Sequence, residues 1–189
     1  MRGSLRTTPS SASTSSAANS GNNLRLGVIL ANLGMLAAMQ KDYETSARYA
    51  TEASTIQREL GDKDGLAVTL HNLGRARLTL GQAEDARTAL AESLRLALGL
   101  GYREVIAYCL GGMAELALLV REEERAAELL GASENLFGEI GVAVDPEEFE
   151  TQERLRRQLY EALGPTRTDE LRANGAARPA AELAAALAL

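Results

Sequence analysis

The chain repeats itself at one fixed period. The tripeptide Asn32-Leu33-Gly34 recurs as Asn72-Leu73-Gly74, a shift of 40, and one more shift of 40 gives a third copy without a gap. Positions that match in all three copies include Glu44, Glu84 and Glu124, and the closing glycines Gly61, Gly101 and Gly141. Self-similarity at a fixed period indicates that each copy is one supersecondary unit, which buries its apolar face by stacking on its neighbours. We therefore expect three repeats, at residues 22–61, 62–101 and 102–141.

Apolar residues within each copy follow the spacing of an amphipathic helix. Leu26, Ile29, Leu30 and Leu33 lie at i, i+3, i+4 and i+7, on one helix face. The chain has 33 alanines and 31 leucines but only 4% aromatic residues, which favours helices over strands. Each copy is therefore predicted to be a helix hairpin, with first helices near 23–39, 64–79 and 103–119 and second helices near 43–59, 83–98 and 122–139.

The pattern of large and small residues in these helices resembles a known repeat. Leu30, Leu33 and Gly34 are followed by Ser46 and Ala50 at the spacing typical of the tetratricopeptide repeat (TPR). The second copy fits in the same way, whereas the third has Ala114 in place of the glycine. The resemblance implies an all-α fold, a TPR-like α-solenoid of three 40-residue helix hairpins followed by C-terminal capping helices.

Segments between and after the repeats resemble one particular group of TPR proteins. They include Leu60-Gly61-Asp62 between copies, residues 127–134 in the third copy, and Asp145-Pro146-Glu147-Glu148 beyond it. These are similar to the C-terminal (MalT-like) TPR region of large bacterial signal-transduction ATPase regulators of LuxR and antibiotic-regulatory type. The phosphate-binding loop G-x-x-x-x-G-K-[ST] does not occur in the sequence, so the ATPase module is not expected on it.

Residues 142–189 are predicted to form capping helices, because the end repeats of a solenoid need a polar outer cover. Asp145 is a typical N-cap with Pro146 at the first helical position, and this helix is expected to end at Gly164. A short helix is expected to stop at Asn174-Gly175, and Pro179 to open a last one. The apolar residues expected to cover the third repeat are Phe149, Leu155, Leu159 and Leu163.

Composition limits the classes of partner. Residues 1–21 are rich in Ser and Thr with few apolar side chains, so we expect a disordered tail. The net charge of −6 argues against direct nucleic-acid binding, which needs clustered basic residues. No apolar run is long enough to predict a membrane span, and one cysteine cannot form an internal disulfide. We expect a cytoplasmic bacterial protein.

The sequence offers no catalytic constellation. His71 is the only histidine and Cys109 the only cysteine, and they occupy positions two residues apart on equivalent helices. Two helical steps turn the direction by about 200°, so the two side chains are expected to point nearly opposite ways. The carboxylates of Glu122-Glu123-Glu124 are expected to favour a helix N-terminus, and Asp62-Lys63-Asp64-Gly65 is interpreted as a turn between helices. We expect no enzyme activity, no metal and no cofactor.

The TPR resemblance implies a concave groove lined by the first helix of each copy. The groove residues so implied are Val28, Asn32 and Met35, then Val68, His71, Asn72 and Arg75, then Tyr108 and Glu115, with Ala31, Ala38, Leu78, Gly111, Gly112 and Leu118 between them. Arg75 lies at the centre and is predicted to hold a ligand's carboxylate or phosphate, with little effect on stability. Two alternatives remain open: Arg75 pairs with Glu115, or the chain's own C-terminal helices fill the groove.

These features predict a non-catalytic protein-interaction or effector-sensing module, part of or derived from a transcriptional or signalling regulator. Its partner would be a protein or peptide, with a small effector as a further option, bound in the groove. The alternative is a self-assembling structural repeat protein, a homodimer formed through the apolar helix at Ala180–Leu189.

Overall fold

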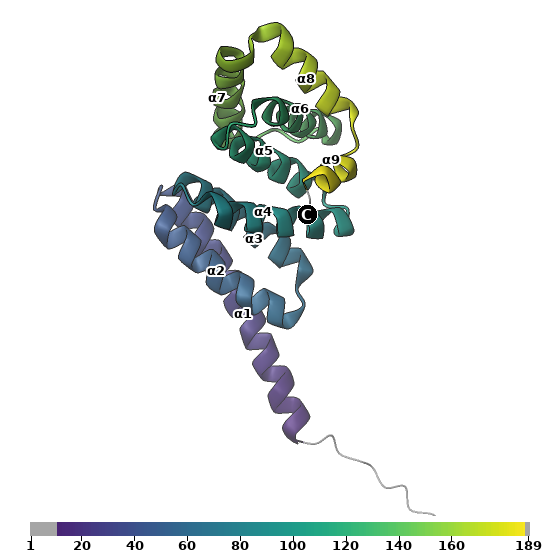
Figure 1. Cartoon of the computed structure of the whole chain (residues 1–189). Coiled ribbons are helices and arrows are strands. Elements are labelled where there is room, and N and C mark those ends of the chain that lie inside the picture. The colour runs from purple at the N-terminus through teal and green to yellow at the C-terminus, as the bar shows by residue number, and fades with distance from the viewer. Residues whose placement is uncertain (1–10, 188–189) are drawn as a thin grey trace, which may run out of the picture.

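The computed structural model describes residues 11–187, with side chains described from residue 21 onward (Figure 1). Every regular element in this part of the chain is an α-helix, which confirms the predicted all-α class. The helices are α1 (Ser11–Met39), α2 (Tyr43–Leu60), α3 (Lys63–Thr79), α4 (Ala83–Leu100), α5 (Arg103–Leu119), α6 (Glu123–Ile140), α7 (Pro146–Leu163), α8 (Pro165–Ala177) and α9 (Ala180–Ala186).

The first six helices form three antiparallel hairpins that stack into a solenoid. α1 packs on α2, α3 on α4 and α5 on α6, while α2 also contacts α3 and α4 contacts α5. Apart from the start of α1, the helix ends lie within two residues of those predicted. Asp42 and Asp62 cap α2 and α3 by accepting hydrogen bonds of 3.0 Å from the amides of Thr45 and Gly65. Of the turn expected at Asp62–Gly65, only Asp62 lies between the helices, because Lys63, Asp64 and Gly65 form the first turn of α3.

Small residues allow the two helices of a hairpin to approach closely. A Cβ atom added to Gly74 on α3 would lie 2.5 Å from Cγ of Leu90 on α4, which is too close to tolerate. On the second helices, Ser46, Ala86 and Ala126 at equivalent positions are all buried. The volume at these positions is therefore fixed by the hairpin seam.

The turn inside each hairpin uses the same left-handed backbone conformation. The φ angles are 62° at Lys41, 72° at Gly81 and 66° at Arg121, which occupy the same position in the three repeats. Only glycine adopts this conformation without a steric cost, so the first and third repeats hold a strained residue where the second holds a relaxed one.

Helix α1 begins earlier than the sequence predicted. We expected residues 1–21 to be disordered, but α1 starts at Ser11, so residues 11–21 belong to the helix. No proline interrupts this segment, and extending an existing helix adds one hydrogen bond for each residue fixed. Residues 1–10 lie outside the described part of the chain.

Helix α8 takes the place that a fourth repeat would occupy. It lies along α6, and a Cβ added to Gly131 or Gly175 would collide with a backbone oxygen of the opposite helix. The prediction that a helix ends at Asn174-Gly175 is therefore wrong, because α8 continues to Ala177. Gly175 serves close helix packing here and does not stop the helix.

Phe149 is the one residue of the predicted apolar stripe of α7 that faces outward. Leu155 and Leu159 are buried as expected, but Phe149 is 57% exposed and Glu148 only 3% exposed. The buried residues Glu148, Thr151, Gln152, Leu155 and Leu159 follow one stripe at helical spacing. Phe149 lies about 100° away from that stripe and so faces outward.

The C-terminal helix α9 packs back on the chain. Leu183 and Ala184 are buried in the main core, and α9 contacts α4. The same core is continuous from the second repeat to α9 and includes Leu90, Leu110, Leu130 and Leu159. Leu183 and Ala184 of the predicted dimerisation helix thus face the protein's own interior, whereas Ala181, Ala185 and Ala186 are exposed. Across residues 11–187, the helices are too short or too polar to cross a bilayer.

Candidate interaction groove

The first helices of the repeats, α1, α3 and α5, lie side by side and present the predicted groove residues on one face. The face divides into two halves. In the N-terminal half, Val28, Asn32 and Met35 of α1 and Val68 of α3 are exposed. In the C-terminal half, the predicted residues are partly buried; these are His71, Asn72, Arg75, Tyr108 and Glu115.

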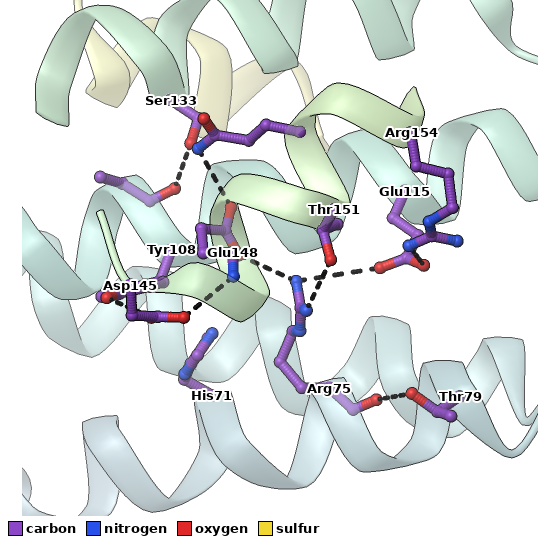
Figure 2. A network of polar contacts seen from close by, with 12 residues as sticks. His71, Arg75, Thr79, Tyr108, Glu115, Ser133, Asp145, Glu148, Thr151 and Arg154 are labelled. Carbon is purple, nitrogen blue, oxygen red and sulfur yellow. Dashed lines mark hydrogen bonds and ion pairs between the residues drawn. The ribbon is translucent and has the colours of Figure 1, made fainter. Parts of the chain in front are cut away.

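Helix α7 covers the C-terminal half of the groove (Figure 2). Nη1 of Arg75 lies 3.1 Å from Oε2 of Glu148, and Nη2 donates to Oγ1 of Thr151 at 3.3 Å. Glu115 lies 3.8 Å from the same guanidinium. The role predicted for Arg75, holding a ligand's carboxylate or phosphate, stays a prediction, because the carboxylates beside it belong to this chain. Of the two alternatives left open by the sequence, Arg75 does lie beside Glu115, whereas a C-terminal helix fills only this half of the groove.

The carboxyl group of Glu148 occupies a space that is open because residue 111 is a glycine. A Cβ at Gly111 of α5 would lie 2.6 Å from Oε1 of Glu148, so a larger residue there would displace the carboxyl group. Nε2 of Gln152 donates to that oxygen at 3.2 Å. Burial raises the pKa of Glu148 to about 7, although Arg75 and Gln152 act in the opposite direction.

The N-terminus of α7 is fixed by Asp145, which joins the helix cap to the groove. Oδ1 of Asp145 accepts a hydrogen bond of 2.9 Å from the amide of Glu148, and Oδ2 accepts one of 2.8 Å from the hydroxyl of Tyr108. Burial and the bond to Asp145 raise the pKa of Tyr108 above its usual value. The phenol therefore stays protonated and remains a hydrogen-bond donor to α7.

His71 is held in its neutral form in the C-terminal half of the groove. Its ring lies 5.3 Å from that of Tyr108, and Nδ1 is 3.3 Å from Oδ1 of Asn72. Nε2 is buried with no hydrogen-bond partner among the described residues. Burial, with a smaller contribution from Arg75, lowers the pKa of His71 to about 3. A proton on this ring would add an uncompensated charge beside a guanidinium.

Beyond Arg75, α7 and the ends of α3 and α5 enclose an open cleft of about 850 Å³. Nη2 of Arg154 on α7 donates to Oε1 of Glu115 at 2.7 Å along its wall. The lining mixes both signs of charge with apolar residues such as Leu78 and Leu118.

The structure brings the two reactive side chains of the sequence into different environments. Cys109 is fully buried, and its Sγ lies 3.2 Å from Oγ of Ser93, whereas His71 faces the groove. Burial raises the pKa of Cys109 to about 12, so the reactive thiolate is disfavoured. Cys109 and His71 therefore do not form a nucleophile–base pair.

Sequence reasoning missed the α7 residues that complete the site. Glu148 lies in the first turn of α7, where a carboxylate is favoured by the helix dipole, so the sequence gives no reason to assign it to the groove. Nothing in the sequence pattern singles out Thr151 or Arg154. The available signal was the spacing of Glu148, Gln152 and Leu155, which places a carboxylate on the stripe that continues into buried leucines. Asp145 was predicted as an N-cap and acts as one.

A family model for the tetratricopeptide repeat matches residues 25–99. The match spans the first two repeats and supports a TPR-repeat protein, in agreement with the stacked hairpins. Neither the curated protein sequences nor the solved structures give a match. TPR repeats generally mediate protein–protein interaction, and their all-helical fold is typically a non-catalytic scaffold.

Proposed function

We propose that this protein is a non-catalytic interaction module that binds an apolar peptide segment in the N-terminal half of its groove. The observation that supports this proposal is the exposure of Val28, Met35 and Val68 on that half, where α7 does not reach. Asn32 lies among them and offers a donor and an acceptor to a peptide backbone. Exposed apolar residues that gather on one face are typical of interaction surfaces.

We propose further that the module is part of, or derived from, a cytoplasmic bacterial signalling or transcriptional regulator. The support is the resemblance of the inter-repeat and C-terminal segments to such regulators. In this scheme the partner or effector binds the repeats, while a separate ATPase or DNA-binding protein produces the output. The mixed-charge cleft beside Arg154 is the place for a small effector.

Peptide selection on the purified chain tests the binding site. Peptides are selected from a random library and their dissociation constants are measured by fluorescence anisotropy. Val68→Glu should weaken binding about tenfold or more, since it puts a charge among the apolar residues of the groove. Val142→Glu is the matched control, because Val68 and Val142 are 44% and 42% exposed. Equal affinities for both variants would exclude the N-terminal half of the groove as the binding surface.

A further inference from the structure

Helix α1 exposes a second apolar stripe, which is separate from its groove residues. Leu26, Ile29, Leu33 and Leu36 recur at helical spacing and are 38–53% exposed. Across the described side chains, α1 supplies eight of the fourteen large apolar residues that are exposed. Monomeric soluble proteins rarely expose a contiguous apolar patch of more than roughly a few hundred Å².

The third repeat shows which helix covers the equivalent stripe there. The equivalent residues of the third repeat, Ile106, Cys109, Met113 and Leu116, are all buried. Cys109 contacts Ser93 of α4, which is the second helix of the preceding repeat. In the first repeat the same positions face outward, so α1 leaves exposed the stripe that α5 buries.

A second copy of the chain is the occupant that this surface fits best. A head-to-tail stack would need the outer face of α6, but α8 already covers it in backbone contact at Gly131 and Gly175. The remaining option for two copies is a two-fold arrangement in which each offers the same patch. Within residues 21–39 the only charged residue is Arg25, so two such helices can meet without strong repulsion.

We propose that the protein forms a two-fold dimer in which the Leu26, Ile29, Leu33 and Leu36 stripes of two α1 helices pack against each other. This interface is formed by α1 of the first repeat, whereas α9 packs on α4 of the second repeat, so it differs from a dimer made through the C-terminal helices. The groove residue Val68 lies outside the stripe. Peptide binding and dimerisation are therefore separable by mutation.

Light scattering and sedimentation on the full chain test the proposal. The wild-type mass should approach twice 20.1 kDa as concentration rises through the micromolar range. Ile29→Arg and Leu36→Arg should weaken the dimer about a hundredfold or more, because the two-fold places two added charges in one interface. Phe149→Arg is the matched control, since Phe149 is as exposed as Ile29 but lies on α7. It should leave the dimer unchanged.

A tryptophan probe keeps the test decisive if the arginine variants fold poorly. The sequence contains no tryptophan, so Ile29→Trp introduces a single reporter at the centre of the stripe. Its emission should move to shorter wavelength as concentration rises, while Phe149→Trp should show no such change. A wild-type chain that stays monomeric, arginine variants that dimerise like the wild type, or Ile29→Trp emission independent of concentration would each overturn the proposal.

Discussion

The first and third repeats share a sequence pattern but differ in how their outer faces are covered. Leu36 of α1 and Leu116 of α5 occupy the same position in their repeats, yet they are 49% and 5% exposed. Helix α5 is enclosed by α4, α6 and α7, whereas α1 contacts α2 and the edge of α3. The difference shows that burial in a repeat protein depends on the neighbouring repeat as much as on the residue itself.

The largest expected effect comes from cutting back these two leucines. Leu116→Ala should lower the free energy of unfolding by about 2–4 kcal/mol, because it leaves a cavity in the core. Leu36→Ala should cost less than about 1 kcal/mol when measured on the monomer, since its side chain already meets water. Urea unfolding at low protein concentration measures both. Equal losses would show that α1 is covered within the monomer.

Replacing Arg75 tests whether α7 is fixed in the covered half of the groove. The sequence predicted little effect on stability, but the structure places Arg75 against the buried carboxyl of Glu148. Arg75→Ala should therefore cost about 1–3 kcal/mol. The loss should be greater at pH 8 than at pH 5, because Glu148 takes up a proton at low pH and then needs no cation.

Urea unfolding at the two pH values measures this difference. Arg95→Ala on α4 is the control, since Arg95 is exposed and remote from α7 in the groove. A loss that is the same at both pH values would contradict the role assigned to Glu148.

The pH dependence of stability separates Glu148 from His71. The folded pKa of Glu148, about 7, is above the ordinary value of 4.5, so its contribution is full below pH 4.5 and is lost as pH rises through 7. The folded pKa of His71, about 3, is below 6.5, so its contribution is full above pH 6.5 and is lost as pH falls toward 3. Between pH 4.5 and pH 6.5, the two groups therefore change the free energy of unfolding in opposite directions as pH rises.

Glu148→Gln should remove the first slope and leave the second, with at most about 1.4 kcal/mol of change per pH unit for one proton. Unfolding free energies of the wild type and the variant from pH 4 to pH 8 measure the difference. Because His71 is the only histidine, its imidazole resonances titrate without overlap in NMR. A His71 midpoint near 6.5 would show that the groove is open to water at this point.

The smallest expected effect concerns the turns inside the first and third hairpins, which should respond alike to substitution. Lys41→Gly and Arg121→Gly should each raise stability by about 0.5–1 kcal/mol, because both residues adopt a left-handed conformation that glycine tolerates better. The turn is local, so coverage of the outer face should not matter. Thermal unfolding compares the two variants, and a gain at only one end would show that the turn depends on its surroundings.

The hairpins could be predicted from the sequence because the signal is local and repeated three times. The fixed period and the helical spacing located the helix ends of the solenoid within two residues, apart from the start of α1. The covered half of the groove could not be predicted in the same way. It depends on which face α7 turns inward, and Phe149 was a more apolar candidate than Glu148 for the buried stripe.

The burial of Glu148 could not be predicted from its own position in the sequence. A carboxylate in the first turn of a helix is favourable in water, so nothing required it to be buried. The buried position of its carboxyl group depends on Gly111 and Arg75, which belong to other helices far away in the chain. Such a site becomes visible only when the helices are placed in space.

Because α7 covers one half of the groove, it also lowers the apparent affinity of any ligand for that half. A ligand for that half binds only molecules in which α7 is displaced, so its apparent dissociation constant is the intrinsic one divided by the displaced fraction. Displacement returns Glu148 to water, where its pKa is lower, so the displaced fraction rises with pH up to about 7. Proton concentration thus acts as a competitor of any such ligand, through a carboxyl group that the ligand itself never touches.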